Sequence, residues 1–165
     1  AANVQSYYST NFGESERINA AVKLKFENDE PSKLGMPLPK GVVRVYKADN
    51  ASNGVFVGED AIDHTPRNEH VDLTLGQAFD ITARVKQLSY EEISSGIYEN
   101  EYEIEIKNAK KEKVTIDLRE ALPGEWKILE ESIEHKKLDA ATAAWQVDVP
   151  AEGSTTLTYK VRIDP

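Results

Sequence analysis

The sequence predicts an all-β protein, an antiparallel β-sandwich of the immunoglobulin-like type with about ten strands. Apolar and polar residues alternate with a period of two in several segments, which is the pattern of strands buried on one face. Glycines that favour turns separate those segments. Many short strands between turn signals are typical of a sandwich, and not of a protein that alternates strands with helices.

Four segments alternate most clearly, at 17–27, 101–107, 113–119 and 156–163. In these segments we expect the following residues to point into the core: Ile18, Ala20, Val22, Leu24, Phe26, Tyr102, Ile104, Ile106, Val114, Ile116, Leu118, Leu157, Tyr159, Val161 and Ile163. Further strands are expected at 42–47, 55–57, 70–75, 79–88 and 145–149. Trp126 and Trp145 are expected to anchor the core.

Three connecting segments need separate interpretation. The polar stretch 108–112 lies between two alternating segments and predicts a hairpin loop, across which outward acids at 101–105 would face Lys113 and Arg119. The proline-rich segment 28–40 is expected to be extended and packed through Leu34, Met36 and Leu38. The segment 128–144 is rich in helix formers, but its neighbours favour two strands at about 126–130 and 132–138 over a helix.

Length and composition favour one domain with a core of its own. The chain has 165 residues, of which 39% are apolar, so a single sandwich domain at 1–165 is expected, with two sub-lobes at about 1–88 and 89–165 as the alternative. Because it opens without Met or an apolar signal segment, we expect a mature product or an excised piece of a longer protein. The apolar runs are too short for a membrane helix.

Charge and cysteine content exclude several classes of function. Twenty Lys and Arg against 29 Asp and Glu give a net charge of -9, which disfavours nucleic-acid binding. The sequence has no cysteine, so it holds no disulfide, thiolate metal site or cysteine nucleophile. Absence of cysteine also fits an exported bacterial protein, so we expect the chain to be located outside the cytoplasm.

Several motifs resemble those of the uncharacterised domain at the C-terminus of mucoidy-inhibitor-A-like bacterial proteins. They occur in the same order at 34–46, 58–66, 75–80, 107–108, 112–114, 124–126, 149–151 and 157–159, so the resemblance covers about 7–163. This resemblance implies an all-β domain near the end of a longer exported or envelope-associated protein. It implies no activity, cofactor or catalytic residue.

The best chemical cluster lies at 59–72, where five carboxylates accompany His64 and His70. Its spacing matches no known metal-ligand motif, and His64 precedes Thr65-Pro66 in an expected turn, so a structural role is favoured over a metal site or a hydrolase. No serine lies in a nucleophile elbow. Tyr7, Tyr8 and Tyr90 are the tyrosines that the alternation leaves outside the core.

The sequence therefore favours a non-catalytic structural or protein-interaction module of an exported or cell-envelope protein, with neither cofactor nor metal. Its expected partner is another protein or the upstream domain of the same chain, and neither nucleic acid nor a membrane span is expected. A partner or ligand surface is predicted at Tyr7, Tyr8, His64, His70 and Tyr90. A module that binds a glycan or a divalent cation is the alternative, followed by a hydrolase that uses His64 and His70.

Overall fold

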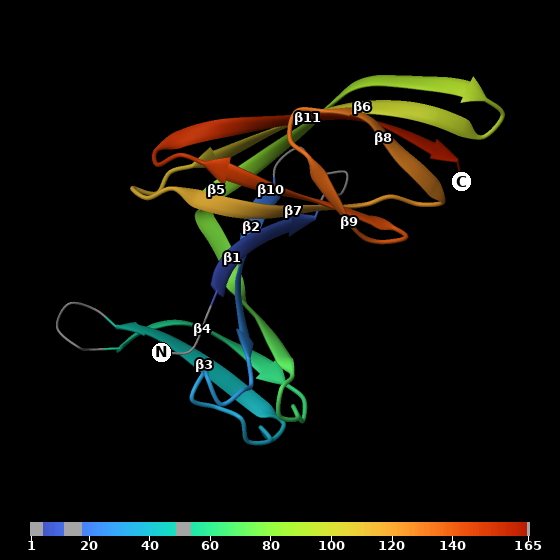
Figure 1. Ribbon diagram of the computed structural model, residues 1–165. Helices are drawn as coiled ribbons and strands as arrows, with labels where there is room; N and C mark the ends of the chain where they lie inside the picture. Colours follow the sequence, from blue (N-terminus) through green and yellow to red (C-terminus); the bar gives the residue numbers. More distant parts are fainter. Residues whose placement is uncertain (1–4, 12–17, 49–53, 165) are drawn as a thin grey trace. The chain divides into compact units, whose positions relative to one another are not determined.

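The structure is a computed structural model that describes residues 5–11, 18–48 and 54–164 (Figure 1). Within these ranges it contains eleven strands and no helix, so the predicted all-β, sandwich-like fold is confirmed. The strands are β1 (Gln5–Asn11), β2 (Ile18–Glu27), β3 (Gly41–Ala48), β4 (Gly54–Ile62), β5 (His70–Ser94), β6 (Ile97–Asn108), β7 (Val114–Ala121), β8 (Glu125–Glu131), β9 (His135–Asp139), β10 (Thr142–Val149) and β11 (Gly153–Asp164). No helix among the described residues has the length and apolar character needed to cross a bilayer.

The chain forms two compact units, each described here by itself. Unit 1 comprises residues 1–7 and 21–77, and unit 2 comprises residues 8–20 and 78–165. Strand β5 belongs to both units, because it continues through Gln77 and Ala78 without interruption. The sequence predicts separate strands at 70–75 and 79–88 instead. Gly76 has a φ of 132°, which glycine adopts readily and other residues rarely do. The strand continues through Gly76 in this conformation instead of ending in a turn.

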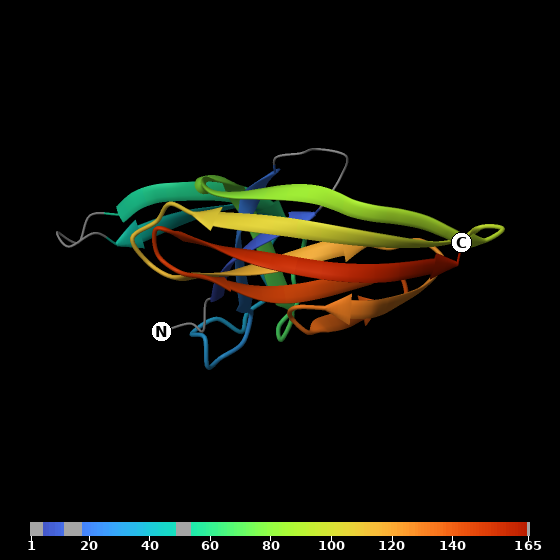
Figure 2. The ribbon, with the colours of Figure 1, turned by 90° about the horizontal axis from the view of Figure 1, so that it is seen from above.

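A curled sheet contains nine strands in the order β8-β11-β6-β5-β2-β1-β7-β10-β9, of which β6 to β11 lie wholly in unit 2. Figure 2 shows β6, β11 and β8 side by side along one layer. Strands β1 and β7 run parallel, whereas the pairs β8–β11, β11–β6, β6–β5, β7–β10 and β10–β9 are antiparallel. Strand β10 also packs against β11 and β6, so the two halves of the sheet face each other as the layers of a sandwich do.

The core of unit 2 lies between these halves and consists of the predicted alternating positions. Buried side chains come from both layers: Ile104, Ile106, Val114, Ile116, Leu118, Trp145, Val147, Val149, Leu157, Tyr159, Val161 and Ile163. The period-two prediction is therefore confirmed for β7, for β11 and for Ile104 and Ile106 of β6, whereas Tyr102 is half-buried. The predicted burial of one face at 22–26 is wrong, since the apolar and polar side chains at 21–24 and 26–27 are alike half-buried. The preference for strands over a helix at 128–144 is also confirmed, since this segment forms the end of β8, all of β9 and the start of β10.

The prediction of a hairpin at 108–112 is wrong. Strand β6 lies between β5 and β11, whereas β7 lies between β1 and β10, so this loop crosses from one half of the sheet to the other. The buried Asn108 holds the crossing: its Nδ2 donates to the carbonyls of Glu112 (2.8 Å) and Pro150 (3.0 Å), and its Oδ1 accepts from the Lys110 amide (2.9 Å).

The ion pairs expected across that hairpin are consequently replaced by others. Lys113 binds Asp148 on β10 at 2.6 Å, and Arg119 binds Asp117 at 2.7 Å. Glu105 pairs with Lys107 on its own strand at 3.4 Å. A polar loop between two strands has the same composition whether it turns back or crosses the core, which is why the sequence did not distinguish them.

Unit 1 contains the β3–β4 hairpin, which packs against the start of β5. Val71 and Leu73 of β5 are buried. Asp60 on β4 accepts a hydrogen bond from the Thr74 amide (2.7 Å). Gly58 is also buried, and a Cβ placed on it would lie 2.9 Å from the Leu75 Cβ and against the Leu75 carbonyl oxygen. The missing side chain therefore allows β4 to approach β5 closely.

We expect Gly58→Ala to destabilise the packing of the hairpin on β5 by about 1–3 kcal/mol, because backbone atoms of Leu75 must move to admit the methyl group. Gly41→Ala is the matched control in β3, where an added Cβ meets nothing within 4 Å. Thermal melting and amide chemical shifts of β3 and β4 measure the effect. Equal behaviour of the two variants would contradict this packing.

Candidate functional site

The outer face of the β3–β4 hairpin exposes a group of large apolar side chains, which we call the hairpin face: Val42, Tyr46, Phe56 and Val57. The exposed fractions of the first three are 58%, 55% and 53%. Tyr46 and Phe56 contact each other edge to face, with ring centroids 5.7 Å apart. Exposed apolar groups of this kind commonly mark sites of contact with another molecule.

A register shift gathers the aromatic residues on this face. Val45 pairs with Gly58, but Tyr46 pairs with Phe56, so Val57 is the additional residue of a β-bulge. Without the bulge, Phe56 would alternate to the inner side together with Gly58. The bulge therefore places Phe56 beside Tyr46 on the outer face.

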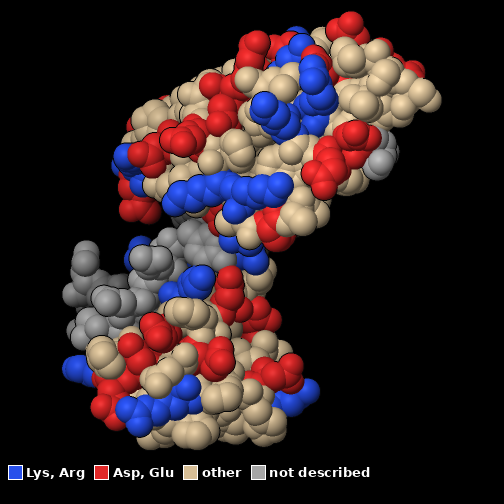
Figure 3. Space-filling model, turned by 45° about the vertical axis from the view of Figure 1, so that its right-hand side comes forward, with Lys and Arg blue, Asp and Glu red and all other residues tan. Residues whose placement is uncertain are grey.

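Two ion pairs lie on the same hairpin, one at its base and one between Val42 and Tyr46 on the outer face. Arg44 of β3 binds Glu59 of β4 at 2.9 Å. Lys40, just before β3, binds Asp63, just after β4, at 3.1 Å. These pairs are exposed and screened by solvent, so they contribute little to stability. On the view in Figure 3, acidic and basic side chains are interspersed over unit 1, and neither sign dominates the surface.

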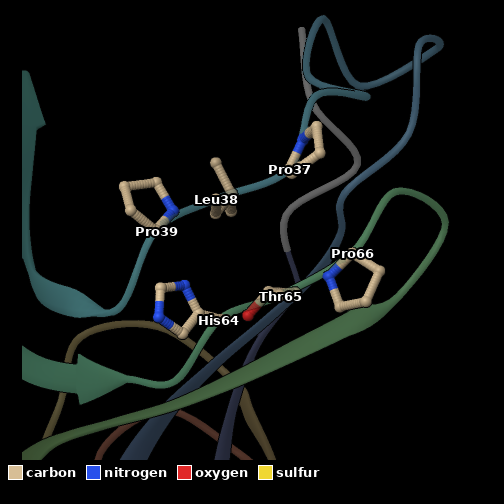
Figure 4. A pocket seen from close by; sticks show the side chains of 6 residues that line it. All are labelled: Pro37, Leu38, Pro39, His64, Thr65 and Pro66. Atoms are coloured by element: carbon tan, nitrogen blue, oxygen red, sulfur yellow. The ribbon is translucent and has the colours of Figure 1, made fainter.

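A shallow pocket of about 380 Å³ lies at the base of the hairpin. Two chain segments form it, one just before β3 and one just after β4, and they face each other in Figure 4. The lining residues are Pro37, Leu38, Pro39, His64, Thr65 and Pro66. The backbones of Leu38 and Thr65 hydrogen-bond to each other, so the pocket extends the ladder of the hairpin.

The buried side chain of Asn28 ties these two walls together. Its Nδ2 donates to the carbonyls of Met36 (2.8 Å) and Pro66 (2.9 Å), and its Oδ1 accepts from the Gly35 amide (3.1 Å). Leu34 and Leu38 are half-buried, but Met36 is 67% exposed, so its expected packing is wrong. The Asn28 bonds fix the backbone around Met36 and leave its side chain outside.

The acidic segment at 59–72 does not converge on one point. Besides the ion pairs of Glu59 and Asp63, Asp60 accepts from the backbone of Thr74, and the His64 Nδ1 accepts from the Lys40 amide at 3.3 Å. His70 is exposed at the start of β5. In the part of the chain that the structure describes, no three His, Asp or Glu side chains are grouped in a way that would hold a metal ion.

The predicted tyrosines divide into two cases. Tyr90 is 63% exposed on β5 and stacks on Tyr98, with ring centroids 5.9 Å apart. Tyr7 and Tyr8 belong to β1, but their side chains lie outside what the structure describes. His64 and His70 lie in unit 1, and Tyr90 lies in unit 2. His64 lines the pocket at the base of the hairpin.

Unit 2 contains a connected group of aromatic and carboxyl side chains, which we call the aromatic cluster: Tyr102, Glu120, Trp126, Glu131, His135, Trp145 and Tyr159. Tyr159 stacks on Trp145 at a centroid distance of 4.8 Å and lies 5.4 Å from Tyr102. The Trp145 Nε1 donates to Glu131 Oε2 at 3.0 Å, and His135 Nδ1 lies 3.0 Å from the same carboxylate.

The two carboxyl groups of the aromatic cluster have opposite electrostatic environments. Burial raises the pKa of Glu120 to about 7 against a weak opposing hydrogen bond from the Tyr159 hydroxyl. Burial also acts to raise the pKa of Glu131, but hydrogen bonds from His135 and Trp145 outweigh it, so that pKa is lowered. Sequence reasoning missed Glu120, although it continues the alternation of Val114, Ile116 and Leu118 on the inner face of β7.

We expect Asn28→Asp to destabilise unit 1 by about 2 kcal/mol or more, because the carboxylate cannot donate to the Met36 and Pro66 carbonyls. Asn68→Asp, an exposed position in the neighbouring loop, is the matched control and should change little. Urea unfolding followed by the amide signals of Met36 and Thr65 tests this. An Asn28→Asp variant as stable as the control would show that these bonds do not hold the pocket.

Comparison with known proteins identifies no family. No family model matches the chain, and no curated protein matches it. One solved structure is similar at low level, the NMR structure of the folded domain of the Mycobacterium tuberculosis protein LppM. The two chains share 9% sequence identity at a TM-score of 0.30, and the match covers 98% of this chain and 91% of that one.

Proposed function

We propose that this chain is a non-catalytic structural or protein-interaction module of an exported or cell-envelope bacterial protein, and that the hairpin face makes the contact. The observation that carries the proposal is the exposure of Val42, Tyr46 and Phe56 together on one side of β3 and β4. Tyrosine and phenylalanine are enriched where proteins bind one another, since they bury much area and lose little side-chain entropy.

The construction of the hairpin supports the same proposal. Its inner side is anchored through Gly58 and Asp60, so the outer side is presented on a fixed backbone. The Lys40–Asp63 pair borders the hairpin face at the base of the hairpin, and the Arg44–Glu59 pair lies on this face between Val42 and Tyr46. Polar groups commonly accompany apolar ones in protein contacts. The resemblance to the terminal domain of mucoidy-inhibitor-A-like proteins supports an envelope location and a partner that is another protein or an upstream domain.

The alternative, a module that binds a glycan or a divalent cation, has less support. The pocket beside His64 is lined mainly by proline and leucine, which offer no oxygen ligands to a cation from their side chains. The acids nearest to it are engaged by Lys40, Arg44 and backbone amides. Thermal-shift titrations with Ca²⁺, Mg²⁺, Zn²⁺ and cell-wall glycans test this alternative, which predicts a rise in melting temperature.

A photo-crosslinking amino acid at Phe56 tests the proposed contact in the bacterium that makes the full-length protein. The probe replaces one aromatic ring by another, so it should preserve the proposed contact. We therefore expect a discrete crosslinked protein, or an intramolecular crosslink to the upstream domain. The same probe at Thr156, which is exposed on β11, is the control and should give neither product.

The crosslink at Phe56 should fall at least about fivefold when Val42→Ser and Tyr46→Ser are added, since both remove apolar contact area. Melting temperature, measured in parallel, verifies that these variants are folded. Equal crosslinking at Phe56 and Thr156, or a crosslink that survives both substitutions, would contradict the proposed contact. Loss of a substrate-dependent activity in His64→Ala and His70→Ala would contradict the non-catalytic assignment.

A further inference from the structure

Glu120 is a half-buried residue of unit 2, at a position where the packing does not require a charge. It lies on the inner face of β7, two residues after the fully buried Leu118, and pairs in register with the buried Ala143 of β10. Its Oε2 is buried and, among the described residues, has no hydrogen-bond partner. A carboxylate in such a place is deprived of water without compensation, whereas a neutral carboxyl group is tolerated.

Among the residues that the structure describes, the groups named here that face Glu120 from β6, β10 and β11 do not supply a positive charge. From β11, the hydroxyl of Tyr159 hydrogen-bonds to the carboxyl group. From β6, Tyr102 lies close enough for the charge on Glu120 to raise the pKa of its phenol, which burial raises further. On β10 the residue in register is Ala143. Glu131 and His135 contact Trp145 farther along the aromatic cluster and bind each other.

We propose that Glu120 is a pH-sensitive element of the fold, protonated while the two halves of unit 2 are packed together and destabilising when it ionises. Ionisation would place a negative charge between β7 and β11, against the ring that stacks on Trp145. Because Tyr159 contacts Tyr102 and Trp145 at once, a movement of this ring is transmitted to β6 and β10. The stability of unit 2 is thereby coupled to proton binding.

The direction of the pH dependence follows from the two states of the carboxyl group. Its pKa is about 7 in the folded chain and near the ordinary value of 4.5 when unfolded, so the folded state holds the additional proton between these values. Stability contributed by Glu120 is therefore fully present at acid pH and is lost as the pH rises toward and through about 7. Above that pH both states are ionised and the contribution is constant.

The test compares the wild-type chain with Glu120→Gln, which keeps the size of the side chain and an acceptor for Tyr159 but does not titrate. Urea unfolding is measured between about pH 5 and about pH 8. For each protein, the ratio of folded to unfolded molecules is compared at the two ends of this range. We expect the fall in this ratio to be more than about tenfold larger for the wild type than for Glu120→Gln. Glu130→Gln, on the exposed side of β8, is the control and should follow the wild type.

A second measurement uses the wild-type protein alone, so it does not depend on whether the variant folds. The ¹³C chemical shift of the Glu120 side-chain carboxyl is followed as a function of pH in the folded state. A midpoint near neutral pH supports the proposal. A midpoint below about 5, or parallel stability profiles for the wild type and Glu120→Gln, would overturn it.

Discussion

The contact between Trp145 and Tyr159 is the interaction on which the structure of unit 2 depends. Trp145 is fully buried on β10, Tyr159 is buried on β11, and their rings stack at 4.8 Å. These strands belong to opposite halves of the curled sheet, so the stack holds the layers together. The Trp145 indole N–H then bonds to Glu131 on β8, and His135 on β9 bonds to the same carboxylate. Both edge strands of the sheet are thus attached to one tryptophan.

The two units differ in what stabilises them. Unit 2 buries large aliphatic and aromatic side chains from several strands, and each such side chain stabilises a fold by about 1.5–3 kcal/mol when it is removed from water. Unit 1 depends instead on local devices: the close approach at Gly58, the bonds of Asn28 and the buried pair Val71 and Leu73. With few core residues of its own, unit 1 displays Val42, Tyr46 and Phe56 rather than burying them.

Particular residues show what the sequence does and does not determine. The alternation at 113–119 and 156–163 correctly predicted buried faces because the period of a strand is fixed by its backbone. The role of 108–112 was not predictable, since what makes it a crossing loop is the contact of Asn108 with Pro150, which is distant in sequence. The hairpin face was missed for a similar reason: a run such as Val42-Val43-Arg44-Val45-Tyr46 predicts a strand but not which side a partner layer covers. Glu120 would have been found by extending the alternation past Leu118.

Native-state hydrogen exchange of the backbone amides tests most directly whether unit 2 is more stable than the β3–β4 hairpin of unit 1. Amides of β10 and β11 around Trp145 and Tyr159 should exchange only through global unfolding, and their protection should be the highest in the chain. Amides of β3 and β4 should exchange through a local opening of lower free energy. Equal protection of the hairpin and of the strands around Trp145, or higher protection of the hairpin, would contradict this division.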